Sequence, residues 1–384
     1  MSSVSDSYKN SANTPSKQTL TKYIAMALLA LLSFGLTGLG AIVVMFALST
    51  LRAGRDSAAS HGISSRNSSR LGGVAIVITF ILFLIGMVLL SSYTPGVVRD
   101  VTFLHVWSTV FVCVILGGAE DIKADLLSPY FRLVVKLLAF GFFLWTTPNV
   151  VPLAIGIPGI DNLLSVPLVA WGLCTIFCVG FINAFNMADG ANGLIPGIAT
   201  IAFGILFLVY GRPAEGVLFF VCLMFLIFNV VSGWFFLGDM GSYGLGAVLV
   251  CYGLLGVAQG DFSAGFMASL LSYPCVDFLV SVIRRLRKGL SPLQADNDHL
   301  HNRLYSFYAP KFKSRVTPNS LTGLTISSGS SGVSLIIYVF DWIAIDSNTW
   351  FGIFGIQVVV YLIILSRLRR TQMNQSELII GMSS

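Results

Sequence analysis

The chain has 384 residues, of which 55% are hydrophobic types and only 10% are Asp, Glu, Lys or Arg. Apolar runs of about 16 to 25 residues recur along nearly the whole sequence, and such runs cross a hydrocarbon core of about 30 Å as helices. Most of these runs are apolar on every side, unlike the amphipathic helices of soluble proteins. The composition therefore excludes an ordinary soluble enzyme and predicts an all-α, polytopic membrane helix bundle.

In chain order we expect about eleven transmembrane helices, at 24–48, 71–91, 102–118, 130–147, 164–182, 194–210, 215–237, 243–258, 264–284, 328–345 and 349–367. The first run follows Lys17 and Lys22, but it is too long for a signal peptide and lacks a small-x-small cleavage site. We interpret it as a retained helix. Runs 194–210 and 243–258 are short, so we expect tilted or partly interfacial helices there.

Three stretches outside these runs are polar. Residues 1–20 form an N-terminal tail, and 371–384 form a C-terminal tail, on either side of one transmembrane domain at 21–370. Residues 316–332 are rich in Ser, Thr, Gly and Asn, so we expect this stretch and the N-terminal tail to be mobile. Residues 148–163 are expected to form a short extracellular hairpin.

The basic residues are distributed unequally between the two faces of the membrane. Five of the 23 lie on one face, namely Lys9, Lys17, Lys22, Arg99 and Arg212. The other eighteen lie on the opposite face, which the positive-inside rule makes cytoplasmic, with the N-terminus outside. The net charge of +6 is therefore a topology signal and does not indicate nucleic-acid binding.

Five polar segments converge on the predicted cytoplasmic face: 64–73, 117–129, 183–194, 238–242 and 284–327. Irregular backbone and acids at a membrane boundary cost several kcal/mol unless they are buried in protein or face water. Each segment alone is equally compatible with helix caps, turns or solvated charges. Their joint position on one face predicts active-site loops.

The acids of these segments supply hard oxygen ligands, and they are Glu120, Asp121, Asp125, Asp189, Asp239, Asp296 and Asp298. With no thiolate cluster and only two loop histidines, this set favours Mg²⁺, or Mn²⁺, over zinc. The six cysteines lie in apolar runs, and we interpret Cys174 and Cys178, one helical turn apart, as packing residues. Cationic side chains and the glycines of GDMGS beside such a metal fit a bound diphosphate.

Asp277 lies inside an expected span, three residues after Pro274. Proline kinks a helix and frees a carbonyl group. We expect a broken ninth helix that brings Asp277 and the basic loop toward the site, and the alternative is a buried acid paired within the bundle.

Five motifs occur in an order typical of one enzyme family. SRLGG (69–73) is similar to its PRxGG segment, and GGAEDIKADLLSP (117–129) is similar to its GxxDDxxxLSP segment. NAFNMADGANGL (183–194) resembles NxxNxxDGxDGL, FLGDMGS (236–242) resembles FxGDxGS, and HLH (299–301) resembles HxH. Over roughly residues 60–305 the chain thus resembles the polyprenyl-phosphate N-acetylhexosamine-1-phosphate transferases, the MraY/WecA-like glycosyltransferase family 4.

The resemblance implies about ten or eleven helices and an active site at the cytoplasmic face of the bacterial inner membrane. It implies transfer of a sugar 1-phosphate from a UDP-N-acetylhexosamine to undecaprenyl phosphate, with release of UMP and a requirement for Mg²⁺. Such products begin O-antigen, capsule, teichoic acid or peptidoglycan synthesis. The sequence does not identify which N-acetylhexosamine is transferred. It also leaves the oligomeric state open, with a homodimer as one option.

The resemblance also implies roles for individual residues. Asp121 takes the place of the second acid of the DD pair, proposed as metal contact, base or nucleophile, and Glu120 takes the first. Asp239 is implied as the Mg²⁺ ligand, and His299 and His301 as phosphate contacts. The residues implied in substrate binding are Arg70, Arg132, Asn183, Asn186, Asp189, Asn192 and Arg303.

Three positions depart from the family pattern. Glu120 replaces an Asp, Asn192 replaces the second Asp of DGxDG, and Ser69 replaces a Pro. These forms resemble a branch that makes surface polysaccharides, which disfavours a MurNAc-pentapeptide donor without excluding it. A direct transfer and a two-step route through a phosphoryl-Asp121 both stay open, and the alternative from another class is a secondary transporter or lipid flippase.

Overall fold

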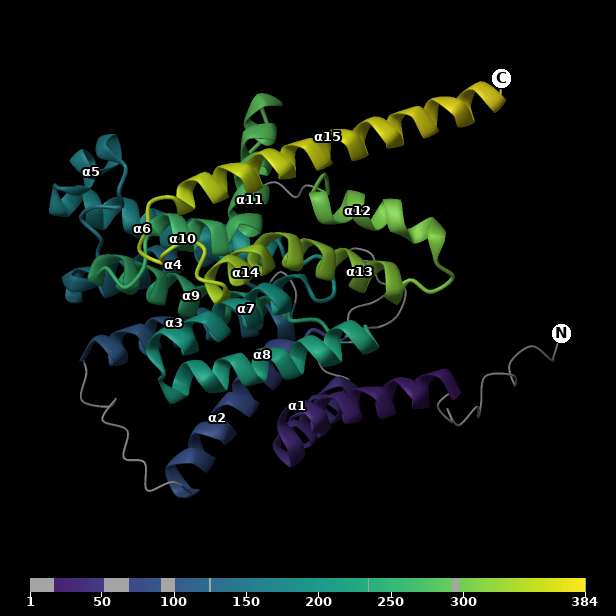
Figure 1. Ribbon diagram of the computed structural model, residues 1–384, viewed down its shortest axis with the longest axis horizontal. Coiled ribbons are helices and arrows are strands. Elements are labelled where there is room, and N and C mark those ends of the chain that lie inside the picture. The colour runs from purple at the N-terminus through teal and green to yellow at the C-terminus, as the bar shows by residue number, and fades with distance from the viewer. Residues whose placement is uncertain are drawn as a thin grey trace.

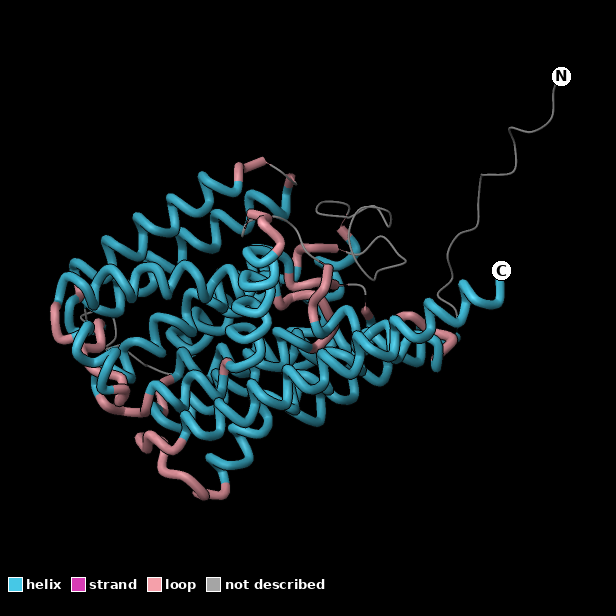
Figure 2. The backbone as a smooth tube through the Cα atoms, turned by 90° about the horizontal axis from the view of Figure 1, so that it is seen from above, coloured by secondary structure: helices cyan, strands magenta, loops and turns pink. Residues whose placement is uncertain are grey.

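The computed structural model describes residues 17–51, 69–90, 101–123, 126–233, 235–291 and 297–383. Helices account for most of these residues, and loops connect them (Figure 2). The β-structure of the described residues is one isolated bridge between Ser69 and Phe235. The all-α prediction is confirmed.

Fifteen α-helices are described, and Figure 1 shows their arrangement. In chain order they are α1 (Lys17–Thr50), α2 (Gly72–Leu90), α3 (Val101–Ile122), α4 (Pro129–Thr146), α5 (Pro158–Leu164), α6 (Pro167–Met187), α7 (Leu194–Tyr210), α8 (Pro213–Ser232), α9 (Gly238–Gln259), α10 (Ala264–Leu270), α11 (Ser272–Arg287), α12 (Leu300–Tyr308), α13 (Val316–Ser327), α14 (Val333–Val339) and α15 (Trp350–Ser383). Short 3-10 turns occupy Pro148–Val150 and Ala309–Lys311, and a π-helical turn, Ser328–Gly332, joins α13 to α14.

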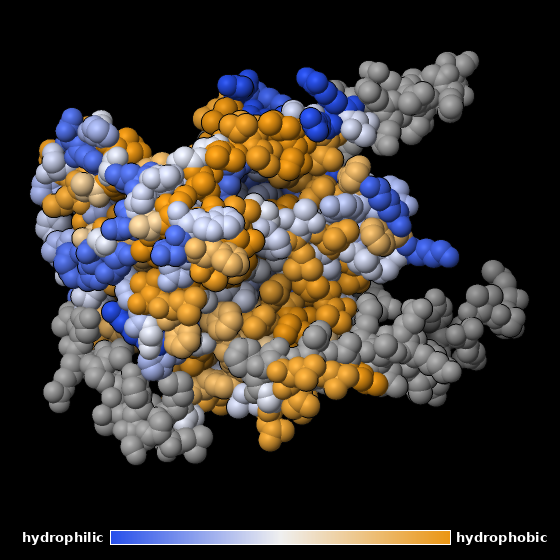
Figure 3. All heavy atoms as spheres, in the orientation of Figure 1, coloured by the Kyte–Doolittle hydropathy of each residue, from blue (hydrophilic) through white to orange (hydrophobic). Residues whose placement is uncertain are grey.

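Among the described residues, seven helical segments are long and apolar enough to span a membrane, and the bent pair α10–α11 makes an eighth. Three shorter apolar helices, Gly35–Thr50, Gly72–Gly86 and Leu194–Tyr210, lie where further spans are predicted. Large apolar side chains such as Leu138 and Phe142 are exposed, and apolar atoms cover much of the face in Figure 3. The chain is a multi-pass membrane protein, and the count of eleven stays a prediction.

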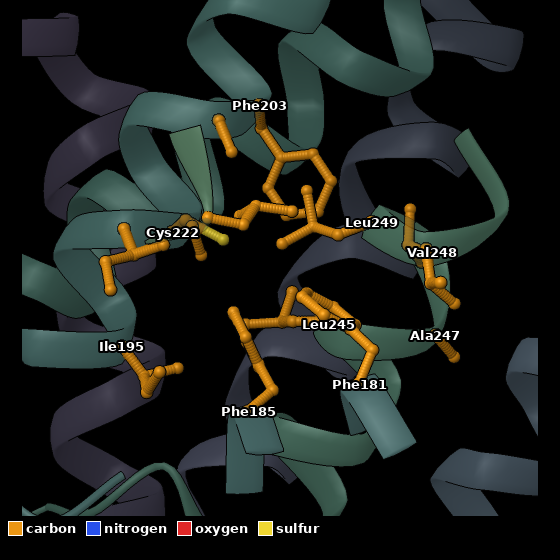
Figure 4. Close-up of a cluster of buried hydrophobic side chains, with 14 of the residues drawn as sticks. Phe181, Phe185, Ile195, Phe203, Cys222, Leu245, Ala247, Val248 and Leu249 are labelled. Atoms are coloured by element: carbon orange, nitrogen blue, oxygen red, sulfur yellow. The ribbon is translucent and has the colours of Figure 1, made fainter. Parts of the chain in front are cut away.

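Helix α9 is the central element of the bundle. Every residue from Gly241 to Gly256 is buried, and α2, α3 and α6 pack around this helix. Figure 4 shows aromatic side chains of α6 and α7 beside the aliphatic side chains of α9. Small residues allow close approach in membrane bundles: a Cβ at Gly117 of α3 would lie 2.3 Å from the carbonyl oxygen of Asp239. This close crossing places the acids of α3 at the start of α9.

Helices α10 and α11 meet at a bend of 80°, which confirms the predicted broken span. The break falls at Leu271, before Pro274. Pro274 occupies the first turn of α11, where no intrahelical N–H donor is required, so it marks the start of the second half instead of kinking a continuous helix.

The prediction of a mobile stretch at 316–332 is wrong, since these residues form α13 and the π-helical turn. Their small side chains serve packing: a Cβ at Gly323 would lie 2.1 Å from the carbonyl oxygen of Asn192. The expected loop 284–327 likewise contains α12 and the whole of α13. Helix α1 includes 17–20, and α15 continues through 371–383.

Some predictions fall on residues outside the described ranges. They include residues 1–16 of the N-terminal tail, the polar residues 64–68, Arg99, and the acids Asp125 and Asp296.

Candidate active site

The start of α9 is built around Asp121, at the end of α3. Its two carboxylate oxygens accept the backbone N–H groups of Asp239 and Met240, at 2.9 and 2.8 Å. Gly238 has φ +73°, and a Cβ there would lie 2.6 Å from Asp121 Oδ2. The glycine therefore lets the carboxylate reach two N–H groups that the first turn of α9 leaves without helical partners.

The SRLGG segment pairs with the chain just before α9. Phe236 N–H donates to Ser69 O at 2.9 Å, while Gly72 and Gly73 N–H donate to Phe236 and Leu237 carbonyls at 3.0 and 2.7 Å. The two motifs are thus held together through their backbones, and the glycines let α2 approach α9.

Arg132, in the first turn of α4, lies between two acids. Its Nη1 is 3.5 Å from Glu120 Oε2 and 3.4 Å from Asp239 Oδ2. The other Glu120 oxygen accepts the Leu127 N–H at 2.7 Å, which ties the 117–129 segment to the same cluster. The guanidinium offsets two neighbouring negative charges beside the start of α9.

Lys136 is a buried member of the site that the sequence analysis missed. One turn beyond Arg132, it is 1% exposed, donates to Asn183 Oδ1, and lies 4.3 Å from the centre of the Tyr243 ring. Lys136 lies four residues after Arg132 on an otherwise apolar helix, so the two side chains share one face of α4. This spacing is the sequence signal that would have indicated Lys136 as a site residue. A buried ammonium group beside carboxylates is suited to binding an anion.

The last turns of α6 carry the two asparagines of NAFNM, which the structure places on the helix. Asn186 Oδ1 accepts the hydroxyl of Ser242 at 2.5 Å, and its side chain also hydrogen-bonds Asp239. Asn183 and Asn186 therefore face α4 and α9, respectively.

Asp189 and Gly190 follow α6 and connect these acids to the histidines. Burial, with the nearby charges of Asp239 and Asp121, raises the pKa of Asp189 to about 8. A Cβ at Gly190 would lie 2.1 Å from His301 Nε2. The DGANG turn thus lies between the acids Asp121 and Asp239 and the histidine His301.

The two histidines are buried at the start of α12. Their rings stack with centroids 5.2 Å apart and an interplanar angle of 7°. His299 Nδ1 lies 2.5 Å from Asp277 Oδ2, and His301 Nδ1 lies 2.8 Å from the Tyr273 hydroxyl. Both partners belong to α11, so the second half of the broken span lies beside the histidine segment. Asp277 is at the same time the buried, paired acid of the alternative, since it is 1% exposed and bonded to His299 and Tyr361.

The chain is similar in sequence to known proteins over much of its length. The family model described as glycosyl transferase family 4 matches residues 103–257. The undecaprenyl-phosphate alpha-N-acetylglucosaminyl 1-phosphate transferase of Thermotoga maritima is 30% identical over 274 residues, covering 71% of this chain and 78% of that protein. The chain belongs to this family.

Two other relatives are named as different transferases and align with different fractions of this chain. The probable undecaprenyl-phosphate N-acetylglucosaminyl 1-phosphate transferase of Bacillus subtilis is 23% identical over 318 residues, or 79% of this chain and 81% of that protein. The phospho-N-acetylmuramoyl-pentapeptide-transferase of Deinococcus radiodurans is 30% identical over 213 residues, or 50% of this chain. The chain spans 63% of that enzyme's length, and 39% of the corresponding Synechococcus enzyme.

Of the three other predicted site residues of this family 4 protein, two lie beside the groups described above and one does not. Arg70 follows Ser69, and its charge acts on Asp121 and Asp239. Arg303 binds Asp298 at the edge of the histidine segment. Asn192 instead faces α13, where its backbone N–H donates to Asn319 at 3.1 Å, so the structure does not bring it to the acids.

No group of three or more His, Cys, Asp or Glu residues that could hold a metal ion occurs among the described residues. Cys174 and Cys178 are both buried in α6. Mg²⁺ commonly uses one or two carboxylates together with substrate phosphates and water. The exposed side of Asp239 fits such a partial set, whereas both Asp121 oxygens already accept backbone N–H groups.

Proposed function

We propose that this family 4 protein transfers an N-acetylhexosamine 1-phosphate from a UDP-sugar to undecaprenyl phosphate and releases UMP. The site would lie at the cytoplasmic face of the bacterial inner membrane, with the N-terminus outside. The observation that carries the proposal is the cluster of Asp239, Arg132 and Lys136 at the N-terminus of the most buried helix. The name of the Thermotoga relative supports the same acceptor, undecaprenyl phosphate, and the same class of transferred group.

The reaction brings two anions together, because a phosphate monoester with a second pKa of about 6 is largely dianionic at neutral pH. Neutralising charge is therefore more important than removing a proton. Arg132 and Lys136 supply positive charge at one place, beside the positive end of the α9 dipole. Attack of the lipid phosphate oxygen on the β-phosphorus then forms the new P–O bond as UMP leaves.

Bound Mg²⁺, or Mn²⁺, would supply Lewis-acid polarisation of the diphosphate oxygens. Asp239 would hold it together with substrate oxygens. Asp121 would orient Asp239 through the backbone, since both its oxygens are engaged there. This arrangement favours direct transfer over a phosphoryl-Asp121 intermediate, because phosphorylation of either oxygen would weaken a hydrogen bond that holds the start of α9.

The nucleotide diphosphate and the lipid phosphate would contact different parts of the site. Asn186, Asp189 and the histidines lie on the side of α6 and α12, where the resemblance implies the nucleotide diphosphate. Arg132, on α4, lies where the resemblance implies the lipid phosphate, and Arg70 lies just before α2. The product would begin O-antigen or capsule synthesis.

The test is UMP release by purified protein with undecaprenyl phosphate, Mg²⁺ and a panel of UDP-amino sugars. We expect metal- and lipid-dependent UMP from one donor, loss on chelation, and recovery on adding Mg²⁺. Asp239→Asn should abolish it, whereas Asp346→Asn, an exposed acid on the predicted opposite face, should not. Lack of UMP from any donor, in folded protein, would contradict the proposal.

A second candidate is phospho-MurNAc-pentapeptide transfer, which the Deinococcus relative's name favours. It requires the same chemistry with a larger donor. UDP-MurNAc-pentapeptide therefore belongs in the panel, and its use in preference to the smaller donors would select this second function. Family membership favours either transferase over the transporter alternative.

A further inference from the structure

Asp277 of α11 joins the C-terminal helix α15 to the histidine segment. The hydroxyl of Tyr361 on α15 donates to Asp277 Oδ1 at 2.7 Å, and the Leu300 N–H donates to the same oxygen at 3.2 Å. Asp277 Oδ2 faces His299 Nδ1 at 2.5 Å. The acid is only 1% exposed, so it acts on a ligand through His299 and not directly.

These contacts define which nitrogen of His299 is available. An ionised carboxylate only accepts hydrogen bonds, so the proton between the two groups resides on Nδ1. The hydroxyl of Ser281 lies 3.3 Å from the same nitrogen. His299 can therefore contact a ligand only through Nε2.

His301 is held in a similar way from α11. Its Nδ1 lies 2.8 Å from the Tyr273 hydroxyl, and the rings of Tyr273 and Tyr361 are 6.2 Å apart. Its Nε2 is directed at Gly190 of the DGANG turn. The two parallel rings thus have their Nδ1 atoms engaged by one set of side chains from α11.

A second contact joins α15 to the residue preceding His299. Arg369 Nη2 lies 2.8 Å from Asp298 Oδ2, and Arg303 of α12 binds the other oxygen of that carboxylate. Figure 1 shows α15 running past α11 and α12. Helix α15 therefore contacts the histidine segment at two points, although its own residues carry none of the family motifs.

We propose that Tyr361 and Asp277 are positioning residues that hold His299 with Nε2 directed at the substrate's phosphate groups, and that α15 thereby sets the activity of the site. The proposal rests on the proposed transfer reaction. Loss of the partners that fix the tautomer and orientation of a metal-binding histidine typically costs about 10- to 100-fold in metal affinity or activity. A similar effect is expected here.

The kinetic test uses Tyr361→Phe, Asp277→Asn and the double variant, with Tyr338→Phe on α14 as the matched control. We expect Tyr361→Phe to lower kcat about 5- to 10-fold with KM for the UDP-sugar changed less than about 2-fold, and Asp277→Asn to lower kcat about 100-fold. Because Tyr361 acts only through Asp277, the double variant should match Asp277→Asn alone. Unchanged kcat in Tyr361→Phe, or multiplying effects in the double variant, would overturn the proposal.

A second measurement does not depend on turnover. The chain has four histidines, so ¹⁵N-histidine NMR of the purified protein gives few signals, and loss of one in His299→Gln assigns His299. We expect Nδ1 to be protonated in the wild type and the proton to move to Nε2 in Asp277→Asn, where an amide N–H faces the ring. A wild-type ring protonated only on Nε2 would refute the positioning role. Absence of UMP from every donor would refute only the transferase function.

Discussion

Asp121 and Asp239 are joined through the backbone, because Asp121 Oδ1 accepts the N–H of Asp239 at 2.9 Å. Its second oxygen accepts the next N–H, that of Met240, at 2.8 Å. Asp121 thus binds the first turn of α9, and Asp239 belongs to that turn. Two carboxylates that look alike in the sequence therefore differ in what their removal should do.

Asp121→Asn should both destabilise the protein and lower its activity. An amide offers one acceptor oxygen, and its NH₂ group would face a backbone N–H, leaving a donor unsatisfied at a cost of about 1–3 kcal/mol. Thermal unfolding in detergent, measured beside UMP release, checks both effects. Asp239→Asn is the matched variant: it keeps the backbone N–H, so activity should be lost with the unfolding temperature nearly unchanged. Equal unfolding temperatures for the two variants would contradict this division of roles.

Gly190→Ala should impair the site through His301. The added Cβ would lie 2.1 Å from His301 Nε2, so the ring or the DGANG turn must move. We expect activity to fall at least about 10-fold, since displacements near 1 Å at a reacting centre can cost about 100-fold. Gly180→Ala on α6 is the control, because a Cβ there meets nothing within 4 Å. Equal UMP release by both variants would show that His301 is not needed in its present position.

Much of this architecture was predictable because membrane burial leaves strong signals in sequence. Long apolar runs predicted the helices, and the bend before Pro274 followed from one proline and one intramembrane acid. The cluster around Asp239 could be anticipated because acids are costly at a membrane boundary and the motifs lie on one predicted face. Of the i, i+4 pair Arg132 and Lys136, only Arg132 was predicted as a site residue, since Lys136 was interpreted as part of the topology signal.

The stretch 316–332 could not be predicted from composition. Ser, Thr, Gly and Asn suggest mobile chain in water, but between helices in a membrane they permit close packing. Whether such residues pack depends on the opposing surface, here the DGANG turn, which is distant in sequence. The structural role of Asn192, whose N–H donates to Asn319, was hidden for the same reason.

Gly323→Ala tests this packing directly. Its Cβ would lie 2.1 Å from the carbonyl oxygen of Asn192, and overpacking of this kind costs about 1–3 kcal/mol. We expect a lower unfolding temperature and reduced activity, because the DGANG turn must shift. Gly329→Ala in the neighbouring π-helical turn is the comparison, since a Cβ there meets nothing within 4 Å. Identical melting of the two variants would argue against close packing of α13 on the turn.

The buried ring of His301 predicts a specific loss of stability in acid. Burial lowers its pKa to about 4, with Asp277 opposing and His299 assisting this shift, whereas an unfolded histidine titrates near about 6.5. The folded state therefore favours the neutral ring. Its contribution is complete above about pH 6.5 and is lost as the pH falls toward 4, by at most about 3 kcal/mol.

Unfolding temperatures of the wild type and His301→Asn, measured from pH 8 to 4, check this prediction. The variant should be less stable than the wild type at pH 8, and the difference should shrink as the solution is acidified, because only the wild type must keep that ring neutral. Tyr273→Phe removes the partner of His301 Nδ1 without removing the ring, so its profile should keep the slope of the wild type. A difference between wild type and His301→Asn that stays constant with pH would mean that the ring is protonated as easily in the folded chain as in the unfolded one, and that it is not held dry between Tyr273 and Gly190.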